Sequence, residues 1–210
     1  MGLLEDKQRA RIFYKYLSRV YDTINPYIWT EEMRSEAIEM LDIPADPVIL
    51  DVGCGTGFAT EALIQYSSEV YGLDQSIHQL HQAQKRLDTY DFLPLILGDA
   101  ERLPFPSDSF DIVWSSGSIE YWPNPIETLA ELRRVTNSGG QVLIVGPHEP
   151  SNTLFKWIAD KIMLFYNKSE ADHMFRKAGF TEFTHQTMGP WYSPNIAITT
   201  VADVKKDESM

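Results

Sequence analysis

The ten residues from Val48 to Gly57 read VILDVGCGTG. The first half, Val48 to Val52, is a continuous apolar run with one acid near its end, which is typical of a strand buried in a parallel sheet. The glycines that follow, Gly53, Gly55 and Gly57, permit a tight turn that leaves bare backbone N–H groups at the start of a helix. Strand, glycine turn and helix in this order predict an open α/β sheet with its ligand at the carboxyl ends of the strands.

The spacing of the glycines narrows the class of ligand. Dinucleotide sites use a related turn, so the turn alone is a weak signal. Here the spacing is Gly-x-Gly-x-Gly rather than Gly-x-Gly-x-x-Gly, which disfavours a pyrophosphate cradle. Asp51 would repel a phosphate placed beside it and suits a cationic or amino-bearing ligand instead.

Two further acids stand where the next strands are predicted to end. Asp74 follows Val70 to Leu73, and its two oxygens suit the adjacent hydroxyls of a ribose. Asp99 follows the third predicted strand, where it can accept a hydrogen bond from an adenine amino group. Each alone is equally well explained as a solvated loop acid, but with Asp51 and the glycine turn they predict a site for S-adenosylmethionine. We assign to it, as cofactor-binding residues, Asp51, Gly53, Gly55, Gly57, Asp74, Gln75, Asp99, Ala100 and Ser116.

Strand and helix patterns alternate along the chain. Predicted strands cover Val48 to Val52, Val70 to Leu73, Leu95 to Leu97, Asp111 to Trp114, Val142 to Val145, Phe183 to Thr187 and Ile196 to Val201. Predicted helices cover about Asp6 to Val20, a segment beginning at Thr30, Phe58 to Tyr66, Ile77 to Leu87, Ile126 to Val135, a segment after Ser151 to about Tyr166, and Lys168 to Ala178. The Gly139-Gly140 pair is predicted to form the turn before the fifth strand. The alternation predicts a Rossmann-like α/β fold: a doubly wound sheet with helices on both faces, behind an N-terminal helical cap.

Composition limits the function classes. The chain of 210 residues carries a net charge of −12, with Lys and Arg gathered no further than pairs such as Arg133-Arg134, so we expect no nucleic-acid partner. Cys54 is the sole cysteine, which excludes an intrachain disulfide and fits a reducing compartment. No apolar run approaches the roughly 20 residues that cross a bilayer, and no histidine pattern indicates a metal. We expect a cytoplasmic protein, leaving open a peripheral contact with a membrane and the oligomeric state.

The glycine turn and the three acids resemble those of the class I methyltransferase family. The resemblance implies S-adenosylmethionine as cofactor, with its methionine end at the glycine loop, its ribose at Asp74 and its adenine at Asp99. It also implies a seven-stranded, mostly parallel sheet whose last strand is antiparallel. Tyr21 belongs to a helix that precedes the sheet, as lids do in this family, which implies a place over the cofactor. We expect one domain over 1–210, with a helical lid at 1–43, a cofactor-binding core at 44–146 and acceptor-side helices and closing strands at 147–210.

A closer resemblance rests on longer segments. These are Phe13-Tyr14 through Trp29-Thr30-Glu31, Asp74 to Leu80, Gly98 to Glu101 through Pro104-Phe105-Pro106, Gly117 to Pro123, Lys177 to Phe180 and Gly189 to Tyr192. Over nearly the whole chain they resemble the 2-methyl-6-phytyl-1,4-benzoquinol methyltransferases of tocopherol and plastoquinone synthesis. Members of that family commonly carry a basic stretch after the Trp-Tyr pair, where this chain has Ser193-Pro194-Asn195. The resemblance implies transfer of a methyl group to a ring carbon of a prenylated benzoquinol or naphthoquinol.

Such a ring becomes nucleophilic at carbon when a base takes or holds the proton of its hydroxyl group. Glu120 and His148, each just beyond a predicted strand, are the candidate bases. A helix-start acid and a solvated loop histidine are the alternative interpretations. Aromatic residues are candidates for an apolar acceptor pocket or for ordinary core packing: Tyr14, Tyr21, Tyr121, Trp122 and Trp191. The segment after Ser151, which is rich in large apolar residues, is interpreted as a cover for that pocket, with contact to a membrane as the alternative.

Other functions stay open at this point. An O- or N-methyltransferase for another small hydrophobic acceptor would need the same cofactor site. A non-catalytic protein that keeps the site as a scaffold has no need of Asp51, Asp74 and Asp99 together. An NAD-binding oxidoreductase is disfavoured by the spacing of the glycine turn.

Overall fold

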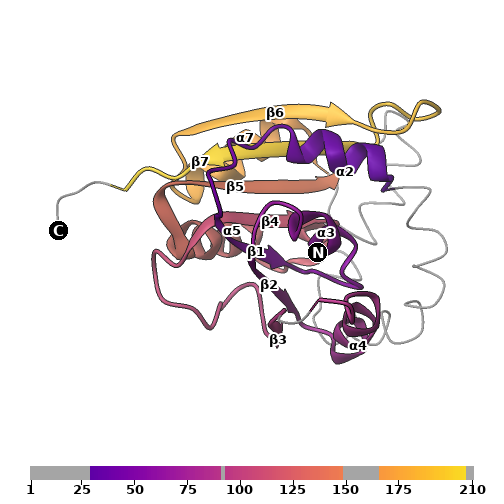
Figure 1. The fold of residues 1–210 in the computed structure, drawn as a ribbon. Helices are drawn as coiled ribbons and strands as arrows, with labels where there is room; N and C mark the ends of the chain where they lie inside the picture. Colours follow the sequence, from indigo (N-terminus) through magenta and orange to yellow (C-terminus); the bar gives the residue numbers. More distant parts are fainter. Residues whose placement is uncertain (1–28, 91–92, 149–165, 207–210) are drawn as a thin grey trace.

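The structure is a computed structural model that describes residues 29–90, 93–148 and 166–206, which form an open sheet with helices on both sides (Figure 1). The sheet has seven strands in the order β3-β2-β1-β4-β5-β7-β6. The strands are β1 (Val48–Val52), β2 (Glu69–Asp74), β3 (Leu95–Leu97), β4 (Phe110–Ser116), β5 (Thr136–Pro147), β6 (Glu182–Met188) and β7 (Ala197–Asp203). Strands β1 to β5 pair in parallel, and β7 runs antiparallel to both of its neighbours. The predicted seven-stranded Rossmann-like α/β sheet with an antiparallel last strand is confirmed.

Helices cover both faces of the sheet, as expected for a doubly wound fold (Figure 1). They are α2 (Glu31–Ile38), α3 (Phe58–Leu63), α4 (Ile77–Arg86), α5 (Pro125–Val135) and α7 (Lys168–Lys177), with a short 3-10 helix η1 (Ile119–Tyr121). One buried cluster joins α2 and α3 to residues such as Ile49 and Leu143. The other joins α5 and α7 to their neighbours Leu50 and Val142, whose side chains point to the opposite face. The alternating strands thus bury one helical layer on each side.

Local polar contacts set where the helices at the carboxyl edge begin. The hydroxyl of Ser76 accepts from the N–H of Gln79 and caps α4 directly after β2. The hydroxyl of Thr30 accepts from the N–H of Met33 in the same way and caps α2. Helix α4 therefore begins shortly after β2 ends, at the carboxyl edge of the sheet. Helix α2 begins directly after Thr30.

The Gly139-Gly140 pair does not form the predicted turn. It lies inside β5, which begins at Thr136 directly after α5. The pairing of β4 with β5 changes register between Phe110 and Ile112, so β5 has extra residues that form no pair with β4. These extra residues form hydrogen bonds with another part of the chain. The N–H of Gly139 donates to the carbonyl of Val204, and the N–H of Val204 donates to the carbonyl of Gly140. This partner follows β7, so no local pattern could have indicated it.

Several predicted features lie outside the described residues. They are Tyr14, Tyr21, the helix from Asp6 to Val20 and most of the apolar segment after Ser151. Within the described ranges, no helix is long and apolar enough to span a membrane.

Candidate functional site

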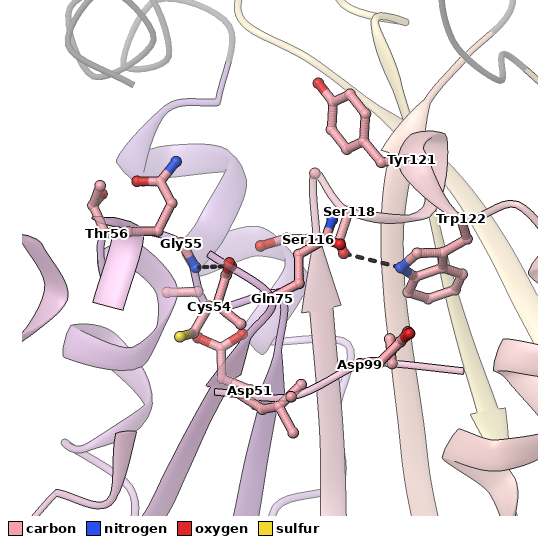
Figure 2. A pocket seen from close by; sticks show the side chains of 18 of the residues that line it. Asp51, Cys54, Gly55, Thr56, Gln75, Asp99, Ser116, Ser118, Tyr121 and Trp122 are labelled. Atoms are coloured by element: carbon pink, nitrogen blue, oxygen red, sulfur yellow. Dashed lines mark hydrogen bonds between the residues drawn. The ribbon is translucent and has the colours of Figure 1, made fainter. Parts of the chain in front are cut away.

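A cavity opens at the carboxyl edge of the parallel strands, around the glycine turn (Figure 2). It holds about 1000 Å³ of space outside the protein atoms, a volume that includes open solvent at its mouth. Its lining includes most of the predicted cofactor residues: Asp51, Gly53, Gly55, Asp74, Gln75, Asp99, Ala100 and Ser116. The structure therefore brings together, at one edge of the sheet, residues that are spread over 66 positions (51 to 116) of the sequence.

The glycine turn adopts backbone angles that other residues avoid. Gly53, Gly55 and Gly57 have φ angles of 73°, 55° and 82°. A side chain on Gly53 would collide with Ser118, whereas a Cβ on Gly55 would meet no atom closer than 4.0 Å. Gly55 thus presents bare backbone to the open side of the cavity. Gly57 does not line the cavity: a Cβ there would lie 2.8 Å from Leu87, so this glycine allows α3 to approach the end of α4.

Asp51 is 1% exposed and forms the floor of the cavity. The hydroxyl of Thr60 donates to its carboxylate at 2.6 Å. Burial, with a smaller contribution from the nearby charge of Asp74, raises the pKa of Asp51 to about 7, although the Thr60 hydrogen bond lowers it in part. A buried carboxyl poised in this way gains a favourable partner when a positively charged group enters the cavity.

Asp74 joins the end of β2 to the glycine turn. Its carboxylate accepts from the N–H of Gly55 at 3.0 Å and from the N–H of Ser76 at 2.8 Å. Burial raises its pKa to about 6, and both backbone donors lower it. Each carboxylate oxygen can accept a second hydrogen bond, and the side chain lines the cavity. Asp74 can therefore hold the turn and a ligand hydroxyl at once.

The loop after β3 supplies a second acidic wall. Asp99 accepts from the N–H of Glu101 at 3.1 Å, and Glu101 in turn accepts from the N–H of Asn124 at 3.1 Å. Both acids line the cavity. The hydroxyl of Ser116 is held by the indole N–H of Trp114 at 3.1 Å, at the end of β4. These contacts fix the loop that faces the glycine turn.

Aromatic side chains also line the cavity, as a set that we name the aromatic wall. Trp29, Tyr121 and Trp122 line the cavity, and the indole N–H of Trp122 donates to Ser118 at 3.1 Å (Figure 2). The indole N–H of Trp29 is buried and has no acceptor among the described residues. Such a donor calls for a ligand atom or a water. Trp191, by contrast, is 91% exposed and belongs neither to the core nor to the cavity lining, so its predicted place in the acceptor pocket is wrong.

Neither of the two candidate bases lines the cavity. Glu120 sits on η1, is 6% exposed and does not line the cavity, although its neighbour Tyr121 does. One of its carboxylate oxygens is buried without a partner among the described residues, and burial raises its pKa to about 7. His148 follows β5, and its backbone N–H donates to the carbonyl of Ile196 at 2.9 Å. His148 also does not line the cavity.

The residues present fit S-adenosylmethionine. Gly55 offers a glycine surface that a Cβ would fill, Trp29 an unsatisfied donor, and Asp51, Asp74 and Asp99 acceptors for amino and hydroxyl groups. In the described ranges, no group of three or more His, Cys, Asp or Glu side chains is arranged to hold a metal.

Comparison with known proteins agrees with this site. Residues 50–144 match the protein family described as "Methyltransferase domain". The chain is 31% identical over 156 residues to demethylmenaquinone methyltransferase of Bacillus licheniformis, covering 71% of this chain and 67% of that protein. The chain belongs to the class I methyltransferases. The methyl donor of this methyltransferase family is S-adenosylmethionine.

Plant methyltransferases are similar over a longer stretch. The chain is 41% identical over 194 residues to 2-methyl-6-phytyl-1,4-hydroquinone methyltransferase 1, chloroplastic, of Oryza sativa subsp. japonica. That alignment covers 90% of this chain but 58% of the rice protein, so the chain spans less than two thirds of its plant relative. A Haloferax volcanii chain, solved with the Trm112 methyltransferase activator, superposes with a TM-score of 0.77 at 22% identity, covering 95% of this chain and 99% of that one. At this identity the likeness shows the shared fold alone.

Sequence reasoning missed several parts of the methyltransferase site. Thr60, the partner of Asp51, lies one turn into α3, and Ser118 fills the space that Gly53 leaves. Trp29 was noticed within a longer segment, without a role of its own. A hydroxyl one helical turn after a glycine loop is a usable signal for Thr60. The approach of Ser118 to Gly53 joins segments that are far apart in the sequence, which no local pattern reports.

Proposed function

We propose that this methyltransferase transfers the methyl group of S-adenosylmethionine to a ring carbon of a prenylated benzoquinol or naphthoquinol. The observation that carries the proposal is the mixed lining of the cavity, which combines acids and glycine backbone with the aromatic residues Trp29, Tyr121 and Trp122. The polar part of the lining suits a polar, cationic donor, and the aromatic part suits a flat apolar ring. The names of the rice and Bacillus relatives, a hydroquinone and a demethylmenaquinone methyltransferase, support the same class of acceptor.

The chain's own residues are proposed to bind and orient. Asp51 faces the amino group of the methionine end, Asp74 the ribose hydroxyls and Asp99 the adenine amino group. When bound, S-adenosylmethionine supplies a methyl group on a positively charged sulfur, which is already a strong electrophile. The main task of the site is therefore alignment of the acceptor carbon with that methyl group, which can contribute several kcal/mol to catalysis. Trp29 and the residues that follow it belong to the proposed lid over 1–43.

Glu120 is the proposed base for the acceptor hydroxyl. It neighbours Tyr121 of the aromatic wall and has a buried carboxylate oxygen with no partner in the described part of the chain. Its pKa is raised to about 7, close to the value at which a carboxyl group exchanges protons efficiently near neutral pH. His148 stays as the second candidate because it stands at the same edge of the sheet, at the end of β5. The two are separated by the pH profile of the Glu120→Gln and His148→Gln variants. The base is the residue whose replacement removes the ascending limb.

The function is tested by following labelled methyl from S-adenosylmethionine to demethylated prenyl quinols in detergent, with simple phenols and small amines as parallel acceptors. We expect label on a ring carbon of the quinol. Label on oxygen or nitrogen of the simple acceptors alone would overturn the proposal in favour of an O- or N-methyltransferase. Cofactor binding by calorimetry, with no transfer to any acceptor, would instead indicate a scaffold that has kept the site.

A further inference from the structure

The turn between β6 and β7 displays two aromatic side chains to solvent. Trp191 is 91% exposed and Tyr192 is 53% exposed, and their rings meet edge to face with centroids 5.6 Å apart. The N–H of Ser193 donates to the carbonyl of Pro190 at 2.8 Å, which closes a four-residue turn with the two aromatic residues at its central positions. The rings are therefore exposed because a hydrogen-bonded turn holds them outward.

The residues around this turn restrict its shape. Pro190 and Pro194 flank the aromatic pair, and proline fixes its own φ angle. Gly189 permits a close backbone approach, since a side chain there would collide with the carbonyl of Ser193. A turn that is already shaped loses little conformational freedom when a partner buries its side chains, which favours binding.

Strand register places the turn at the same edge of the sheet as the cofactor cavity. The last residue of β5, Pro147, pairs with Ala197, and Ala197 pairs with Met188 at the end of β6. The turn at 189–196 thus extends beyond the carboxyl end of β5 (Figure 1), and the residues that line the cavity also stand at the carboxyl ends of the parallel strands. A surface that covers the turn would therefore lie along the same edge of the sheet as the cavity.

The charge of the turn differs from that of the chain. Residues 189–196 contain no Asp, Glu, Lys or Arg, although the chain carries a net charge of −12. An anionic surface would repel such a chain. Tryptophan and tyrosine are enriched where an apolar layer meets water, because the ring is apolar and its N–H or O–H stays hydrated. The turn is therefore best matched by an uncharged surface at which an apolar layer meets water.

We propose that the Trp191–Tyr192 turn docks this methyltransferase on the headgroup layer of a neutral phospholipid bilayer. Docking sets the cavity mouth toward the lipid in which a prenylated acceptor dissolves. The identity of that acceptor rests on the proposed function, whereas the docking itself does not and is measured without any acceptor.

The test uses the 210-residue chain with vesicles of phosphatidylcholine, followed by flotation. We expect the chain to float with the vesicles, and the W191A/Y192A variant to partition about tenfold less, since two aromatic side chains lose their burial. The matched control is Tyr66→Ala. Tyr66 is 47% exposed but precedes Ser67, whose hydroxyl bonds to the carbonyl of Pro47 at the start of β1, so it lies at the opposite edge of the sheet. Its replacement should leave partition unchanged.

Two further measurements keep the outcome decisive. Brominated phosphatidylcholine should quench the wild-type fluorescence more than that of W191F, and W191F/Y192F should restore most of the partition. Equal partition of wild type and W191A/Y192A would overturn the proposal, as would an equal loss in the Tyr66 variant. Binding only to phosphatidylglycerol vesicles, and its loss in salt, would also overturn it, because it would assign the contact to charge. Failure of methyl transfer to prenyl quinols with docking intact would overturn the proposed acceptor alone.

Discussion

The two walls of the cavity are built from different kinds of sequence. The cofactor wall consists of Asp51, Asp74 and Asp99, each at the end of a parallel strand or just after it. The aromatic wall combines Trp29, which precedes α2, with residues of η1 and the loop after it. Strand ends of an open sheet converge at one edge, so the first wall follows from the fold itself. The second wall depends on which segments cover that edge. These segments can differ between methyltransferases with different acceptors, although the methyl donor is the same.

The largest expected effect lies in the cofactor wall. Asp74→Ala removes the acceptor of Gly55 and the proposed ribose contact, so we expect S-adenosylmethionine to bind about 1000-fold more weakly by calorimetry. Asp111→Ala is the matched control, because Asp111 also accepts a backbone N–H, that of Val48 at 2.9 Å, but at the other edge of the sheet. Unchanged affinity in the Asp74 variant would show that the ribose lies elsewhere.

On the acceptor side, Glu120→Gln should lower kcat by about 100-fold while leaving cofactor affinity close to wild type, because it removes a base and no donor contact. In the wild type, kcat should rise with pH through about 7, where the buried carboxyl loses its proton. The Glu120→Gln variant should lack this rise of kcat with pH, which is the ascending limb of the pH profile. A variant that kept both the rate and the limb would exclude Glu120 and direct attention to His148.

A smaller effect is expected at Trp29, which also lines the cavity. Trp29→Phe keeps the ring but removes the unsatisfied indole N–H, so we expect binding of S-adenosylmethionine to weaken by about tenfold. Trp191→Phe removes an indole N–H that lies outside the cavity lining and should leave cofactor binding unchanged. If the loss at Trp29 appears in the KM of the quinol and not in cofactor affinity, the N–H belongs to the acceptor site.

The smallest effect concerns protonation of the cavity floor. Asp51 must be ionised to attract a cationic ligand, so affinity should rise with pH through about 7, its pKa in the free protein. Thr60→Val removes the hydrogen bond that favours the carboxylate, which should move this midpoint to higher pH and weaken binding about threefold at neutral pH. Thr128→Val removes another buried hydroxyl, bonded to the carbonyl of Asn124, and should leave the midpoint in place.

The contrast between the walls also explains what the sequence could predict. Strands such as Leu95–Leu97 and the glycine turn were predicted closely, because alternation and glycine spacing are local signals. Gly139-Gly140 was misplaced because its hydrogen bonds reach Val204. The exposure of Trp191 was misjudged because composition cannot distinguish a displayed ring from a buried one. The sequence therefore predicted that the strand-end acids lie together at one edge and singled out Tyr121 and Trp122, whereas the place of Trp29 in the cavity lining needed the structure.

The most direct test of the account is the identity of the methylated atom. A demethylated prenyl quinol is turned over with S-adenosylmethionine that carries a ¹³C-labelled methyl group, and the product is examined by two-dimensional NMR. We predict that the labelled methyl correlates with ring carbons and ring protons, as a C-methyl group does. A labelled methyl bonded to oxygen, or an unlabelled quinol recovered while the cofactor is bound, would contradict the account.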